Sequence, residues 1–155
     1  MIEELSEIAW KFRHAIENAR EAGEYGELFI KFPDGQCGNV SDLLSQYLND
    51  LGYESVYYVN GTFYDFDNED SQSHTWLEVK GIIIDITGDQ FRQRQEPLKC
   101  DVPVYVGPID EWHKIFDTSH GSYYIHTGLQ ETWFIYAELK RWYETILTFL
   151  DNTEK

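Results

Sequence analysis

Apolar residues recur at intervals of three and four in three stretches of the chain, a spacing that gathers them on one face of a helix. The first stretch covers residues 2–22 and stops at Gly23, the second runs from near Cys37 to Gly52, and the third covers residues 131–150. Glycine commonly ends a helix. The pattern therefore predicts one helix near each end of the chain and one between them.

The period changes to two between the second and third of these helices, which is typical of β-strands. Residues 54–60 predict a strand, residues 74–79 and 82–87 alternate around a Lys-Gly pair, and residues 102–106 predict another strand. A two-residue turn that contains glycine is a common hairpin connection. The middle of the chain is therefore predicted to contain a β-hairpin.

Residues 62–73 are polar, acidic and aromatic, and they predict a loop. The acidic residues resemble the start of a calcium-binding loop, but the sixth position is Asp70, where such a loop needs glycine, and the twelfth is Trp76, where it needs glutamate. We expect a solvated loop beside a site instead. Residues 109–130 combine turn residues, aromatics and histidines, and show no period that predicts an element.

Alternation divides the side chains of the predicted hairpin between two faces. The apolar face, which must meet the core, carries Thr75, Leu77, Val79, Ile82, Ile84 and Ile86. The other face carries His74, Trp76, Asp85 and Thr87. With Lys80 and Gly81 as the turn, His74 and Asp85 become diagonal neighbours whose Cα atoms lie roughly 7–8 Å apart. A slip of one residue would turn His74 and Asp85 into the core instead, so the apolar face fixes this register.

Cys37 stands at the predicted start of the second helix. A thiol with an ordinary pKa of about 8.5 needs a lower pKa to act as a nucleophile at neutral pH, and both a helix N-terminus and a neighbouring imidazolium lower it. A cysteine at a helix start is more often a small buried residue, but an aspartate within the run IIIDIT needs a partner. Taken together, Cys37, His74 and Asp85 are predicted to be nucleophile, base and orienting acid.

The order of several short motifs resembles the transglutaminase-like group of the papain-fold cysteine enzymes. The motifs are Gly35-Gln36-Cys37, Leu51-Gly52, Val56 to Gly61, His74-Thr75-Trp76-Leu77-Glu78 and Asp85-Ile86-Thr87. The resemblance covers about Asp34 to Thr87. The following residues GDQF match no part of the pattern, and Ile82 to Ile84 stand where a tryptophan often precedes the aspartate.

The resemblance implies an α+β fold with a papain/transglutaminase-like core, in which a catalytic helix packs on an antiparallel sheet. The helices near the two ends of the chain would flank this core in a single domain of residues 1–155. It also implies a Cys-His-Asp triad and acyl transfer through a thioester. Flanking loops usually set the substrate, and fold alone does not choose one activity.

We therefore expect a thiol hydrolase, either a peptidase or a deamidase, that acts on an amide through a thioester at Cys37. A transglutaminase or acyltransferase that uses the same triad is an alternative. A non-enzymatic acidic binding or immunity-type protein on a degenerate papain-like fold is another. The backbone N–H of Cys37 and the side chain of Gln36 are candidate oxyanion donors, and Trp76 is a candidate wall of the cleft or a packing residue.

The net charge of −16, from 12 basic and 28 acidic side chains, argues against nucleic-acid binding. It favours solubility, and a protein or peptide partner that is cationic. No apolar run approaches the roughly 20 residues of a membrane span, and the acidic, amphipathic N-terminus is unlike a secretory signal. We expect a cytoplasmic protein that uses no membrane; the pattern leaves its oligomeric state open.

Two cysteines, Cys37 and Cys100, are too few for a disulfide framework, so a reducing compartment is the expectation and a bridge between them the minor alternative. No glycine-rich phosphate loop or other cofactor signature is present, and no cofactor is expected. The spacing of His113, His120 and His126 fits no common metal pattern, so no metal site is expected either.

Overall fold

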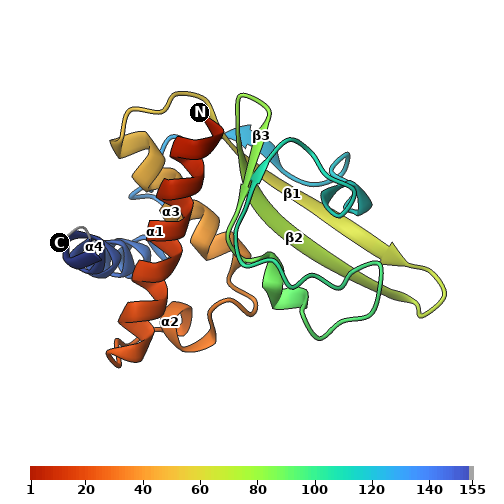
Figure 1. Cartoon of the computed structure of the whole chain (residues 1–155), viewed down its shortest axis with the longest axis horizontal. Helices are drawn as coiled ribbons and strands as arrows, with labels where there is room; N and C mark the ends of the chain where they lie inside the picture. The colour runs from red at the N-terminus through yellow and green to blue at the C-terminus, as the bar shows by residue number, and fades with distance from the viewer. Residues whose placement is uncertain (154–155) are drawn as a thin grey trace.

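A computed structural model describes residues 1–153 and has an α+β fold (Figure 1). Its four α-helices are α1 (Ile2–Glu21), α2 (Glu27–Lys31), α3 (Cys37–Asp50) and α4 (Tyr136–Thr153). Its strands are β1 (Val56–Asp65), β2 (Asp70–Val79), β3 (Ile82–Asp85), β4 (Tyr105–Gly107) and β5 (Tyr123–Ile125), and the 3-10 helices are η1 (Gly88–Phe91) and η2 (His113–Ile115). The strands form one antiparallel sheet in the order β4-β3-β2-β1-β5.

The three predicted helices are present, with one shifted boundary. Helices α1 and α3 begin and end within two residues of the prediction, while α4 begins at Tyr136 rather than at residue 131. The residues before α4 form turns, in which the Trp133 N–H bonds the Gln130 carbonyl and the Tyr136 N–H bonds the Trp133 carbonyl. No helix within residues 1–153 is long and apolar enough to cross a membrane.

The prediction of a loop over residues 62–73 is wrong. Strands β1 and β2 pair continuously from Val56 and Val79 out to Asp65 and Asp70, so only residues 66–69 form the turn. Threonine, phenylalanine and tyrosine favour strands, and their backbone pairing continues past the point where the sheet has a buried face. The strand predicted over residues 102–106 is also shifted, to Tyr105–Gly107, because Pro103 has no N–H for a ladder.

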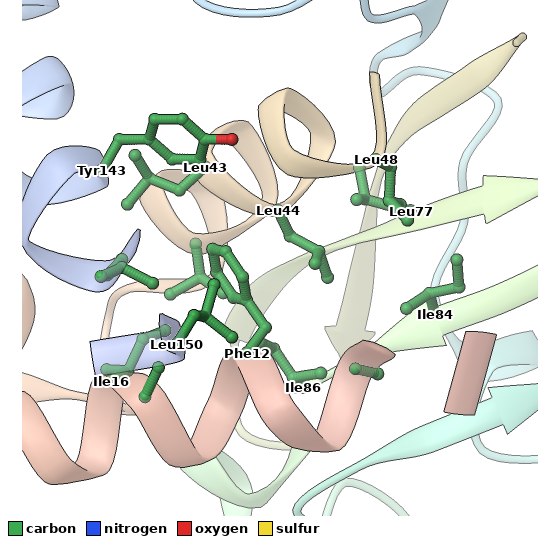
Figure 2. Close-up of a cluster of buried hydrophobic side chains, with 14 of the residues drawn as sticks. Phe12, Ile16, Leu43, Leu44, Leu48, Leu77, Ile84, Ile86, Tyr143 and Leu150 are labelled. Atoms are coloured by element: carbon green, nitrogen blue, oxygen red, sulfur yellow. The ribbon is translucent and has the colours of Figure 1, made fainter. Parts of the chain in front are cut away.

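The predicted hairpin register is confirmed by the pairs Val79 with Ile82 and Leu77 with Ile84. The turn residues Lys80 and Gly81 have φ of 51° and 77°, as a two-residue type I′ turn requires. The apolar face of the hairpin packs against α1 and α3, while α4 packs on the outside of α1 (Figure 1). Figure 2 shows this core, to which α1 contributes Phe12 and Ile16, α3 Leu43, Leu44 and Leu48, the sheet Leu77 and Ile84, the segment after β3 Ile86, and α4 Tyr143 and Leu150.

The second face of the hairpin is also buried, so the expectation that the register keeps His74 and Asp85 out of the interior is wrong. His74 is 0% exposed and Asp85 3%. Residues 88–118 cover this face with aromatic side chains that form a second cluster. Gly61 lets the cover approach closely, because a Cβ there would lie 2.9 Å from the Phe116 Cβ atom.

Candidate active site

Cys37 is the first residue of α3, and the turn before it sets the start of the helix. Gly35 has a φ of 69°, a left-handed conformation that glycine adopts without strain, and Gln36 is the N-cap. The first N–H groups of a helix have no partner within it and favour a negative charge nearby. The Cys37 side chain is half-buried, so its thiol lies where a thiolate is stabilised and is not wholly closed off from solvent.

His74 on β2 contacts Asp85 at the end of β3. The His74 Nε2 atom lies 2.7 Å from Asp85 Oδ2, and the other carboxylate oxygen accepts the Thr87 N–H at 3.0 Å. The short distance is that of a charge-assisted hydrogen bond. Because Nε2 donates to Asp85, the Nδ1 atom of His74 is the one left to face Cys37.

Helix α3 packs on β2 and brings Cys37 to His74. Burial raises the pKa of the Cys37 thiol, but the hydrogen bond and positive charge of His74 lower it, as do hydrogen bonds from the Gln90 side chain and the Thr75 backbone. The net result is a pKa below the ordinary value. The structure therefore brings the three side chains together, with His74 in contact with both Cys37 and Asp85.

The pKa values of the other two members move in the complementary directions. Burial lowers the pKa of His74, but the charge of Asp85, its hydrogen bond and the contact with Cys37 raise this pKa to about 9. Burial raises the pKa of Asp85, but the charge of His74 and hydrogen bonds from His113 and His74 hold it well below its usual range. Near neutral pH these shifts favour a thiolate, an imidazolium and a carboxylate in a row.

Gln90 of η1 is a site residue that the sequence analysis missed. Its Nε2 atom lies 3.1 Å from His74 Nδ1 and 3.1 Å from the Thr87 carbonyl oxygen, and its side chain also bonds Cys37. Its Oε1 atom accepts the Gly35 N–H at 3.4 Å. The available signal was the run GDQF directly after the hairpin, which matched no part of the family pattern.

A buried arginine fixes the segment that carries Gln90. Arg13 of α1 donates two hydrogen bonds of 2.8 Å to the two carboxylate oxygens of Asp89. It also donates to the carbonyl oxygens of Ile86 and Pro103, each at 2.9 Å. A bidentate pair with two further acceptors holds a backbone segment in one orientation, and here that segment is the one beside Gln90.

The two remaining predicted residues are buried beside these contacts. Gln36 is 2% exposed, and its side-chain oxygen accepts a hydrogen bond of 3.0 Å from Asn39. Trp76 lies behind His74, with ring centroids 5.7 Å apart, and meets His113 edge-on at 4.9 Å. The Trp76 Nε1 atom is buried with no hydrogen-bond partner among the described residues.

His113 of η2 joins the site from the covering segment. Its Nε2 atom lies 2.7 Å from Asp85 Oδ2, the same oxygen that His74 contacts. Its Nδ1 atom lies 2.6 Å from Asp110 Oδ1, which also accepts the His113 backbone N–H at 2.8 Å. Sequence analysis weighed His113 only as a metal ligand, because the covering segment has no period from which its direction follows.

His74, Asp85 and His113 form a group whose ligand atoms lie within 4.8 Å of one another, as metal ligands do. Ligands about 2.0–2.1 Å from one tetrahedral zinc ion keep roughly 3.3 Å between them. Both nitrogens here lie 2.7 Å from the same carboxylate oxygen, which is a hydrogen-bond distance. The geometry favours hydrogens, rather than a metal ion, between these atoms.

The other histidines weighed with His113 lie apart from this group. His120 is exposed, and the Nε2 atom of His126 is 2.9 Å from Asp42 Oδ1. Both cysteines are free, so the bridge between Cys37 and Cys100 is not formed. Burial raises the pKa of the Cys100 thiol to about 11, together with the charges of nearby aspartates.

A hollow of the surface lies away from these contacts. It has a volume of about 750 Å³ and is lined by residues 63–68, 70–72 and 93–98. A smaller cavity of about 60 Å³ borders Asp85, Cys100 and His113 on the side of the covering segment. The candidate site is therefore defined by its contacts and not by this hollow.

A comparison of the chain with protein-family models, curated protein sequences and solved structures finds no match.

Proposed function

We propose that this chain is a cysteine-dependent acyl-transfer enzyme, and first a thiol hydrolase that acts on an amide through a thioester at Cys37. One observation carries the proposal: the Cys37 thiol meets His74, whose other ring nitrogen is held by buried Asp85. A nucleophile, a base and a group that orients the base are the parts that thiol acyl transfer needs.

In the first step the Cys37 thiolate attacks the carbonyl carbon of an amide. A C–S bond forms as the carbonyl π electrons move to oxygen. The backbone N–H of Cys37 is one donor to this oxyanion, since it is unpaired within the helix. Gln36 is the further donor expected from the sequence, through its side-chain N–H groups, since its side-chain oxygen accepts from Asn39. The side-chain N–H groups of Gln90 already face the Thr87 carbonyl oxygen and His74 Nδ1.

In the second step the C–N bond breaks, and His74 gives its Nδ1 proton to the leaving nitrogen. The acyl group then remains on Cys37 as a thioester. His74, now neutral, takes a proton from water as the water attacks, and the thiolate leaves. Gln90 suits both states: its N–H donates to neutral Nδ1, and it donates to the sulfur when Nδ1 carries a hydrogen.

The fold also supports the proposal. A helix that begins at Cys37 packs on an antiparallel sheet that carries His74 and Asp85 on successive strands. We propose that this unit is a papain/transglutaminase-like core, as the sequence motifs imply. The net charge of −16 favours a cationic protein or peptide as substrate.

Two other functions are alternatives to hydrolysis, and the experiments below distinguish them from it. A transglutaminase or acyltransferase would use the same thioester and pass the acyl group to an amine or another acceptor. An acidic binding protein that masks a basic surface would need the charge but not a reactive thiol.

The test is the rate at which iodoacetamide alkylates Cys37 in the native protein near pH 7, with the modified cysteine located by mass spectrometry. We expect rapid modification of Cys37. His74→Ala should slow it about 30-fold or more, since a thiol of ordinary pKa is only a few per cent thiolate at this pH. His14→Ala is the matched control, because His14 is half exposed on α1, where its ring stacks on Trp10 and its Nδ1 atom lies 3.1 Å from Glu17 Oε1.

The acyl step is tested with a panel of fluorogenic peptide amides and glutamine-containing peptides, with release of amine or ammonia as the readout. Release that is lost in Cys37→Ala supports hydrolysis. Release that occurs only when a primary amine is supplied assigns transfer instead. If Cys37 reacts with iodoacetamide only after unfolding, the enzyme is ruled out and the acidic binding protein takes its place.

A further inference from the structure

One carboxylate oxygen of Asp85 serves two imidazoles. Asp85 Oδ2 lies 2.7 Å from His74 Nε2 and 2.7 Å from His113 Nε2. Because an ionised carboxylate only accepts, both Nε2 atoms must carry a hydrogen. The two rings therefore approach Asp85 as donors from different parts of the chain, His74 from β2 and His113 from η2.

The far nitrogen of His113 is bound as firmly as the near one. Its Nδ1 atom lies 2.6 Å from Asp110 Oδ1, so both ring nitrogens face carboxylates. The ring is 2% exposed and lies edge-on to Trp112 and to Trp76, at centroid distances of 4.8 and 4.9 Å. His113 is thus fixed by packing and by two polar contacts, and it cannot turn without leaving Asp85.

This arrangement adds two groups to the proposed triad. Read from Cys37, the contacts run to His74, Asp85, His113 and Asp110. A carboxylate that holds a histidine must itself be held, because a small rotation of Asp85 would move the His74 ring away from the thiol. In metal sites, loss of an outer residue that orients a ligand typically lowers metal affinity or activity by about 10–100-fold. We expect an effect of the same order for a residue that orients Asp85.

We propose that His113 is a positioning residue: held by Asp110, it fixes Asp85 Oδ2 and thereby aims His74 Nδ1 at Cys37. This inference rests on the proposed function, because it names the residue on which the orientation of that base depends. The ring nitrogens of His113 contact Asp85 and Asp110, so its role in this proposal is to orient and not to react.

Two substitutions separate the hydrogen bond to Asp85 from the packing of the ring. His113→Gln places an amide N–H near the position of Nε2 and keeps a donor for Asp85. His113→Asn places it near Nδ1, where it reaches Asp110 and not Asp85. Both remove the aromatic ring, so a role in packing alone predicts the same result for both.

The first readout is the iodoacetamide rate constant of Cys37 near pH 7 in folded protein, with folding checked by near-ultraviolet circular dichroism. We expect His113→Asn to lower the rate about 10-fold or more, and His113→Gln to stay within about threefold of the parent. If His113→Asn does not fold, His113→Phe replaces it, since it keeps an aromatic ring and has no donor. His120→Asn, an exposed histidine of the same covering segment, is the control.

The second readout does not need a reactive thiol. The hydrogen on His74 Nε2 is buried in a short bond to Asp85 and should give a slowly exchanging, far-downfield proton signal in ¹⁵N-histidine-labelled protein. We expect the signal to remain in His113→Gln and to be lost in His113→Asn. A parent whose Cys37 is unreactive overturns the proposed function alone, while this signal still tests His113.

Equal loss of both readouts in the two variants would reduce His113 to packing and overturn the inference. Unchanged readouts in both variants would overturn it as well, because Asp85 would then hold His74 without help. Only one result supports a positioning role for His113: the His113→Gln variant keeps the alkylation rate and the proton signal, and the His113→Asn variant loses both.

Discussion

The two faces of the β2–β3 hairpin meet different kinds of structure. One face carries Leu77, Val79, Ile84 and Ile86 and packs against the regular helices α1 and α3. The other carries His74 and Asp85 and meets residues 88–118, a segment made of turns, a short edge strand and two 3-10 helices. The same two strands thus separate an aliphatic core from a polar line of contacts.

The two faces contribute differently to stability. Burying one aliphatic side chain contributes about 1.5–3 kcal/mol to the free energy of unfolding. The side chains around it need an apolar group of similar volume, but no particular atom. A buried hydrogen bond contributes about 1 kcal/mol net, while leaving one of its partners unpaired costs about 1–3 kcal/mol. The polar face therefore gains little stability from its contacts but depends on each atom being present, and substitutions on the two faces should separate stability from reactivity.

The largest effect is expected for Asp85→Asn, which keeps the shape of the polar face and removes its charge. If the amide oxygen takes the place of Oδ2, the NH2 group faces the Thr87 N–H, and if the NH2 group takes that place, it faces the Nε2 hydrogens of His74 and His113. Either orientation sets donors against each other and removes the charge, so the proton on His74 is no longer firmly held on Nε2. Turnover of a substrate found in the peptide panel should fall about 10³–10⁴-fold, as in other triads whose acid is made neutral. The measurement is kcat for parent and variant under the same conditions.

Asp89→Asn is a matched control for this substitution, since Asp89 is a nearby, partly buried acid that pairs with Arg13 rather than with His74. It should cost far less turnover than Asp85→Asn. Equal losses would mean that charge in this region, and not the contact with His74, supports the chemistry.

A smaller effect, and one of another kind, is expected for Leu77→Ala on the aliphatic face. Leu77 is 0% exposed within the helix-covered core. Its truncation should lower the free energy of unfolding by about 3 kcal/mol, from lost burial and the cavity left behind. Urea unfolding measures this loss, and the alkylation rate of Cys37 in the folded fraction should stay within about twofold of the parent. A large fall in that rate would show that the two faces are coupled.

The sequence was informative where one face of an element is apolar. The apolar residues of the hairpin and its Lys-Gly turn were enough to predict the register of Leu77 with Ile84, which the structure confirms. That register led to the expectation that His74 and Asp85 are neighbours, and they lie in contact. A period of two needs no knowledge of the rest of the chain, because burial of one face alone determines it.

The cover of the polar face could not be predicted in the same way. Residues 88–118 are held by single contacts between distant residues, such as Arg13 with Asp89 and the Trp112 Nε1–H with the Leu98 carbonyl oxygen. Such contacts leave no period in the sequence. The positions of Gln90 and His113, and the burial of His74, follow from this cover and were therefore missed.

The last effect is a slope with pH, at most about 1.4 kcal/mol for each pH unit, that the polar face should produce. In a Cys37→Ser background the thiol no longer titrates, and His74 remains next to Asp85, the main cause that raises its pKa to about 9 in the parent. A histidine whose pKa is higher in the folded than in the unfolded state stabilises fully below the unfolded value, about 6.5. That stabilisation is lost as pH rises through the folded value.

The free energy of unfolding of Cys37→Ser should therefore fall between pH 6.5 and about 9, by at most about 1.4 kcal/mol for each pH unit. Adding His74→Gln should remove this part of the slope. Adding Leu77→Ala instead should shift the whole curve down and leave the slope in place, because an aliphatic side chain binds no proton. The measurement is a series of urea unfolding curves at pH 6, 7, 8 and 9. If His74→Gln leaves the slope unchanged, His74 does not gain a proton on folding, and the polar face is held by neutral hydrogen bonds alone.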